Sequence, residues 1–191
     1  MKLNSMIVSF IFLANFAYAS EISNCGNNEE ARLLVKLIKE DRGQKRRQIR
    51  CNKMLTVAAE AKAKKMAEFG LVAHNLGGSP NSRLERLGYK LPRNYGWQFN
   101  SNQVEAVAGG YSDAYTMWEV FKRSDVHRVH LLGEHEFYLE QDEIGAAFVE
   151  KWDSPHVEYW VVYLTKGYKK DQSYSESFIN ILSKASFELD K

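Results

Sequence analysis

The segment Val157–Leu164 constrains the fold of this chain more than any other part of the sequence. Its residues are apolar at both odd and even positions. Successive side chains of a β-strand point to opposite faces of the sheet, so such a strand must be buried on both faces. Helices are therefore needed on each side of the sheet. The apolar segment 143–151 is expected to pair with this strand as an antiparallel hairpin, across a turn that contains Asp153, Ser154 and Pro155.

Amphipathic segments elsewhere in the chain can supply these helices. The first is expected to begin at Asn28 and run to about Asp41, and a second to lie between the capping residues Asn52 and Gly70. Others are predicted over 112–123, from Ser124 to Gly133, and over a C-terminal tail at 173–189. On the second helix, Lys62, Lys64 and Lys65 are expected to face water. The sequence thus predicts an α+β fold, a three-layer α-β-α sandwich followed by a tail helix.

The N-terminal segment has the pattern of an export signal. Lys2 precedes an apolar run, and Ala17-Tyr18-Ala19 provides a cleavage site at 1–19. An uncleaved anchor is the alternative, but the run is shorter than the ~20 residues that span a bilayer. We therefore expect a secreted protein, extracellular or periplasmic, that does not cross a membrane after cleavage. Its expected organisation is an N-terminal segment at 20–28, one domain at 29–166 and the tail at 167–191.

Charge gives limited information about partners. The chain has 26 basic and 24 acidic residues, and this near balance argues against a nucleic-acid partner. A local basic cluster could be a solvated loop, or it could contact an anionic surface. Its members are Arg42, Lys45, Arg46, Arg47 and Arg50.

The chain has two cysteines, Cys25 and Cys51. An even number of cysteines in an exported protein is most simply explained by a disulfide between them. A nucleophilic thiol is the alternative, but neither cysteine has a histidine nearby in the sequence and an oxidising compartment would consume it.

The histidines are the first candidates for chemistry, because imidazole binds metals and transfers protons near neutral pH. His130 fits an ordinary helix-surface residue, and His135 and His156 are expected to be solvated in turns. Glu105 lies among apolar residues, where an ionised carboxylate needs a partner or a raised pKa. A histidine would satisfy it.

Several motifs occur in a recognisable order. After a first helix come His74, the segment 83–89 (RLERLGY), Glu105, a tryptophan-containing helix and Ser124-x-x-His127, followed by Leu131-Leu132, Ile144-Gly145 and the last strand. Over roughly 29–165 the chain resembles the CAP superfamily of cysteine-rich secretory proteins, antigen 5 and pathogenesis-related-1 proteins. It looks most like the short bacterial, SCP-like branch. The resemblance implies the same α-β-α sandwich.

In that family, two histidines and two acidic residues line a central cleft that binds a divalent metal in some members. The resemblance places His74 and His127 on the histidines and Glu105 on the first acid. The family's Glu-Asn pair is Glu105-Ala106 here. The second acid's place falls on Ser124, and Glu119 lies one turn earlier as a substitute.

These observations leave several functions open. The leading hypothesis is a non-catalytic binding or effector module that requires no cofactor, with a small ligand, lipid or peptide in a cleft lined by His74, Glu105, Ser124 and His127. The alternative is a metal-dependent hydrolase acting on peptides or cell-wall material. There His74, His127 and Glu105 would hold an ion such as Zn²⁺, or Glu105 would serve as general base.

Less specific interpretations also remain. The two histidines could be a polar pair that only holds two layers together. The basic cluster and the tail helix could recruit a partner. Four aromatic residues could form a ligand groove, although core packing is the commoner role of such residues. They are Trp118, Phe121, Trp152 and Trp160.

Overall fold

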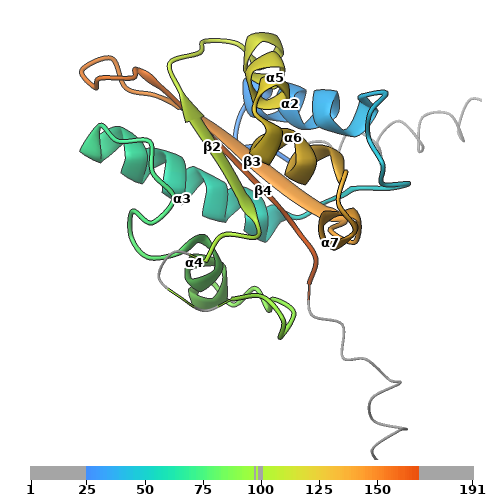
Figure 1. Ribbon diagram of the computed structural model, residues 1–191. Coiled ribbons are helices and arrows are strands. Elements are labelled where there is room, and N and C mark those ends of the chain that lie inside the picture. Colours follow the sequence, from blue (N-terminus) through green and yellow to red (C-terminus); the bar gives the residue numbers. More distant parts are fainter. Residues whose placement is uncertain (1–24, 97, 99–100, 168–191) are drawn as a thin grey trace, which may run out of the picture.

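The computed structural model describes residues 25–96, 98 and 101–167, and a mixed four-stranded sheet lies at its centre (Figure 1). The strand order is β1-β3-β4-β2. β1 is parallel to β3, whereas β3 and β2 both pair with β4 in the antiparallel sense, which confirms the predicted hairpin. The strand bounds are β1 Arg50–Cys51, β2 Glu105–Gly109, β3 Glu143–Glu150 and β4 Glu158–Thr165.

Helices cover both faces of this sheet, as Figure 1 shows. One face carries α2 (Glu29–Glu40), α5 (Ala114–Arg123) and α6 (Asp125–Leu132). The other carries α3 (Lys53–Phe69) and α4 (Pro80–Arg86). The four-residue α7 (Glu136–Leu139) follows α6. The structure therefore confirms the three-layer α+β fold.

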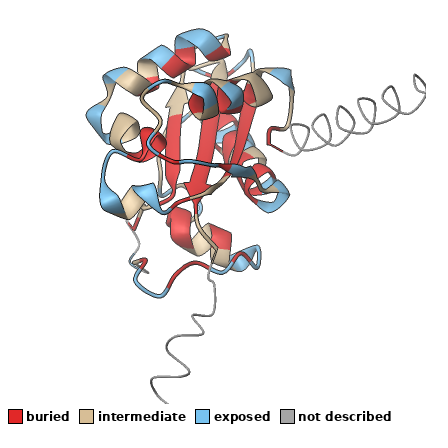
Figure 2. Ribbon diagram, turned by 90° about the vertical axis from the view of Figure 1, so that its right-hand side faces the viewer, coloured by how far each residue is buried: buried red, intermediate tan, exposed pale blue. Residues whose placement is uncertain are grey.

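The last strand separates the two halves of the core. Alternate residues Trp160, Val162 and Leu164 pack with α2, α5 and α6. Their neighbours Tyr159, Val161 and Tyr163 pack with α3 and α4. All six side chains are fully buried, and Figure 2 shows the strands as a buried layer between partly exposed helices. Burial on both faces is what the uninterrupted apolar pattern predicted.

Side-chain caps set the helix ends largely where the sequence predicts them. The Asn28 side chain accepts from the Ala31 amide at the start of α2, and Asn52 caps α3 in the same way. Gly70 ends α3 and Gly133 ends α6 in the left-handed conformation that glycine adopts without strain. The helix α4, which begins at Pro80 after a Ser79 cap, lies in a segment that the sequence indicated to be turns.

The basic cluster is not the continuous exposed surface that the sequence predicted. Arg46 is buried, and its guanidinium donates to the backbone carbonyls of His130, Leu131 and Tyr138. Arg50 forms ion pairs with Asp142 and Glu143. The exposed members of the cluster are Arg42, Lys45 and Arg47.

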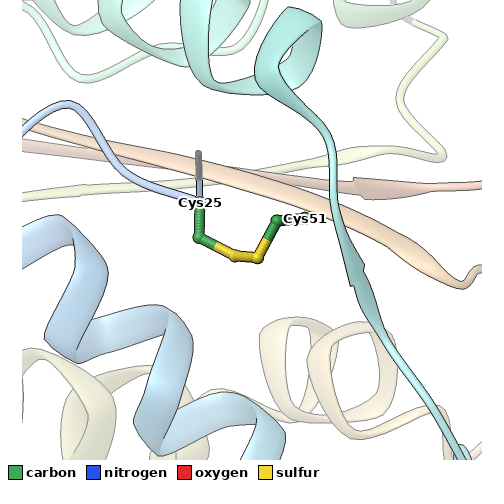
Figure 3. Close-up of a disulfide and its surroundings, with 2 residues drawn as sticks. All are labelled: Cys25 and Cys51. Carbon is green, nitrogen blue, oxygen red and sulfur yellow. A yellow bond between two sulfur atoms is a disulfide. The ribbon is translucent and has the colours of Figure 1, made fainter. Parts of the chain in front are cut away.

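A disulfide joins Cys25 to Cys51, as predicted, with a Cα–Cα distance of 4.7 Å (Figure 3). The Ala146 amide donates to the Cys25 carbonyl at 2.8 Å, and Cys51 pairs with Ile144. The bond therefore connects two segments that both run beside β3.

Two predicted segments lie outside the described residues, namely the export signal at 1–19 and the tail helix at 168–191. Within the described part of the chain, none of the helices combines the length and apolar character that crossing a membrane requires.

Candidate functional site

Glu105 is the centre of a buried polar cluster. It is the first residue of β2, and its side chain is completely enclosed. One carboxylate oxygen, Oε1, lies 3.0 Å from His74 Nδ1, and the other, Oε2, accepts from Arg83 Nη2. Arg83 Nε also donates to the Tyr163 hydroxyl at 3.1 Å, and Tyr163 is the residue paired with Glu105 across β2 and β4. The sheet register thus brings four side chains into one cluster.

The surroundings of Glu105 favour its ionised form. Burial alone would raise the pKa of Glu105. The hydrogen bond from His74 and the positive charges of Arg83 and Lys62 outweigh burial, so the pKa of Glu105 lies below its ordinary value. Glu105 is therefore a carboxylate anchored by cations. The expected histidine partner is present, and Arg83 is a second partner that the sequence did not reveal.

His74 lies in the loop between α3 and α4, with its side chain 40% exposed. A carboxylate can only accept, so the 3.0 Å contact with Glu105 places the hydrogen on Nδ1 of the imidazole. Asn102 lies beside the same ring and donates to the Glu105 carbonyl at 3.0 Å. This arrangement fixes the ring and leaves Nε2 as the atom able to contact a ligand.

His127 lies on α6 in the same region of the molecule. Its ring packs edge-on against Phe121, with a centroid distance of 5.0 Å, and it is partly buried. Burial lowers the pKa of His127, and the nearby charge of His74 lowers it further. The structure therefore brings the two imidazoles within electrostatic reach of each other, although 53 positions separate them along the chain.

The remaining candidates of the predicted site are less closely connected to it. Ser124 lies between α5 and α6 and its side chain forms no capping hydrogen bond with α6. Glu119, the proposed substitute for the second acid, is 58% exposed and forms an ion pair with Lys122 at 2.7 Å. The structure thus gives neither side chain a contact with His74 or Glu105 in the described part of the chain.

The other histidines differ partly from expectation. His130 is buried instead of lying on a helix surface, and its Nε2 lies 2.9 Å from the Leu164 carbonyl. His135 is exposed, and its ring accepts from the Phe137 amide at the start of α7. His156 is only partly exposed and packs against the Tyr159 ring.

Lys62 is a further member of the site, and the prediction that it faces water is wrong. Only 1% of Lys62 is exposed. Its ammonium donates to the backbone carbonyls of Ala73, His74 and Leu76. The sequence did contain a signal, because Lys62 lies three residues after Ala59 and four before Met66, on the apolar side of its helix.

The aromatic residues do not assemble into a groove. Trp118, Phe121 and Trp160 are core residues, whereas Trp152 is 79% exposed in the turn between β3 and β4. Core packing, the commoner role of such residues, is what the structure shows for the first three.

A hydrolytic zinc centre with three protein ligands does not fit this geometry. The described residues contain no group of three or more histidine, cysteine, aspartate or glutamate side chains arranged to hold a metal ion. Both oxygens of Glu105 are already occupied by Arg83 and His74. The imidazoles of His74 and His127 remain as the two groups that could contact an ion or another ligand.

Comparisons with known proteins support the fold. No protein-family model and no curated protein matches the chain. The structure is similar to that of an outer surface protein from Borrelia burgdorferi, which has a CAP-like fold, with a TM-score of 0.57 and 20% sequence identity. The similarity covers 74% of this chain and 95% of that one. At this level of identity the likeness concerns the fold alone.

Proposed function

We propose that this chain is an exported, non-catalytic binding module of the SCP-like branch of the CAP superfamily. Its contact groups are the imidazoles of His74 and His127, and its ligand is a small molecule, lipid, peptide or divalent ion. The fold it shares with a bacterial outer surface protein supports an envelope or extracellular location. The export pattern at 1–19 points the same way.

One observation carries this proposal, namely that both carboxylate oxygens of Glu105 are held by partners. A general base must be free to take a proton from water or substrate. Glu105 could do so only by giving up its buried ion pair with Arg83, which leaves an uncompensated charge in the core. Its role is therefore to orient His74, and the hydrolase alternative gains no support from this geometry.

Titration of the purified exported protein with Zn²⁺ tests the proposal, because Zn²⁺ is a probe that two imidazoles can chelate. We expect calorimetry to show binding that weakens about tenfold or more, ~1.4 kcal/mol or more, in His74→Ala and in His127→Ala. His135→Asn is the matched control, since His135 is exposed and asparagine can still cap α7.

Equal Zn²⁺ binding by all four proteins would show that this histidine pair is not the binding site. Peptide or cell-wall hydrolysis that disappears in Glu105→Gln would instead establish the hydrolase.

A further inference from the structure

The loop 73–78 has no regular secondary structure, yet two enclosed cations hold it in place. Lys62 Nζ, from α3, donates to the carbonyls of Ala73, His74 and Leu76. Arg83 Nη1, from α4, donates to the carbonyls of His74, Leu76 and Gly78. The carbonyls of His74 and Leu76 thus receive hydrogen bonds from both cations. The loop that presents His74 is built around positive charge.

Only the protonated form of Lys62 satisfies this arrangement. An ammonium group has three N–H donors, and three carbonyls accept from it here. A neutral amine would have two donors and a lone pair, which would face a carbonyl oxygen. A buried ammonium is costly unless it is hydrogen-bonded and near an opposite charge, and the nearby carboxylate of Glu105 supplies that charge.

We propose that Lys62 is a positioning residue for His74, and that loss of its proton releases the loop 73–78 and weakens ligand binding. This inference rests on the proposed function, because it concerns how the same site is presented. Arg83 keeps its charge, so the loop would retain one of its two anchors when Lys62 becomes neutral.

The groups that face Lys62 set the pH range of this effect. Burial lowers the pKa of Lys62 to about 8; Glu105 on β2 acts to raise it, whereas Arg83 on α4 and Lys65 on α3 act to lower it further. Burial and Glu105 raise the pKa of Tyr163 well above its ordinary value, so this hydroxyl stays protonated. The change is therefore expected between about pH 7 and pH 9, one unit on each side of the Lys62 pKa.

Nuclear magnetic resonance of the exported protein tests the inference. We would follow the methyl signals of Ala73 and Leu76 and the ring signals of His74 from about pH 7 to about pH 9.5. In the wild type, they should shift together with the Lys62 Cε signal, with a midpoint near pH 8. In Lys62→Met they should not titrate in this range, and at neutral pH Zn²⁺ binding should be about tenfold weaker.

Lys64→Met is the matched control, because Lys64 is an exposed lysine on the same helix. It should titrate and bind as the wild type does. Loop signals that do not follow Lys62 in the wild type would overturn the inference, and this measurement decides the question even if Lys62→Met fails to fold.

The proposed function and this inference can fail separately. Zn²⁺ binding that depends on His74 and His127, without titration of the loop, would leave the function and remove the regulation. Titration of the loop in a protein whose Zn²⁺ binding ignores both histidines would remove the function and leave Lys62 as a positioning residue of the loop alone.

Discussion

Among single residues, polar groups in the core are held by backbone carbonyls as well as by charges. His130 is 4% exposed, and its Nε2–H donates to the Leu164 carbonyl. Its ring lies 4.8 Å from that of Tyr138. Burial lowers the pKa of His130 to about 4, and the neighbouring Arg46 adds to the effect. His130 is therefore neutral in the folded protein, and a proton added to it would be a buried charge without a carboxylate partner among the causes of its shift.

This neutral histidine should make the fold sensitive to acid. The pKa of His130 in the folded state, about 4, is below the ordinary 6.5, so its contribution is fully present above pH 6.5 and is lost as pH falls towards 4. That gap corresponds to roughly 3 kcal/mol of unfolding free energy. Urea denaturation at about pH 7 and about pH 4.5 should show a smaller loss in His130→Gln, which keeps an N–H donor but cannot titrate in this range.

His135→Asn is the control for this prediction, because it removes an exposed histidine. If His130→Gln loses as much stability on acidification as the wild type and this control, His130 is not responsible for the acid sensitivity.

Among the helices and strands, close approach between α3 and the sheet determines how the second layer packs. The alanines of α3, including Ala59 and Ala63, are fully buried and keep the helix near the strands. Gly145 on β3 contributes most directly, since a Cβ atom at this position would lie 2.3 Å from the Thr56 nitrogen and 2.6 Å from the Leu55 carbonyl carbon. Both atoms belong to the helix backbone, so a side chain would have to push the whole helix away.

Gly145→Ala should therefore destabilise the protein although it adds a single methyl group. We expect the free energy of unfolding to fall by about 1–3 kcal/mol, the usual cost of overpacking a core. Thermal and urea denaturation would measure it.

Gly167→Ala serves as the control for this packing prediction, because a Cβ atom there would first meet the Tyr89 hydroxyl at 3.6 Å, an ordinary contact. Equal stability of the two variants would show that α3 can move away from β3 without cost.

Across the molecule as a whole, two long-range connections hold the layers together. The Glu105 cluster joins β2 and β4 to α4 and to the loop after α3. The disulfide joins the segment before α2 to β1, across 26 positions of the chain. One connection is electrostatic and buried, whereas the other is covalent.

Removal of the disulfide should lower stability while leaving the architecture intact. For a loop of this length, chain entropy predicts a loss of ~3–4 kcal/mol in Cys25→Ser/Cys51→Ser. Circular dichroism should remain native-like, because the hydrogen bond from Ala146 to Cys25 and the pairing of Cys51 with Ile144 do not need the sulfur atoms. Unchanged denaturation midpoints in the variant and in the reduced wild type would contradict this expectation.

The architecture of the protein could be predicted from the amino-acid sequence. The apolar pattern of 157–164 required two covered faces, and residues such as Asn52 and Gly133 marked helix ends, because burial pattern and capping are local properties. A partner for Glu105 was also predictable, since a carboxylate among apolar residues needs one.

The partners of the buried charges, in contrast, depend on how distant elements pack. Arg83 meets Glu105, Arg46 meets the carbonyls after α6, and Lys62 meets the loop 73–78, through contacts between different elements. β1 and β2 are too short to carry a periodic signal, and they form because β3 and β4 offer edges for them to pair with. A charged residue is predicted to be exposed until the layer that encloses it is in place, because the partners that stabilise it come from distant parts of the chain.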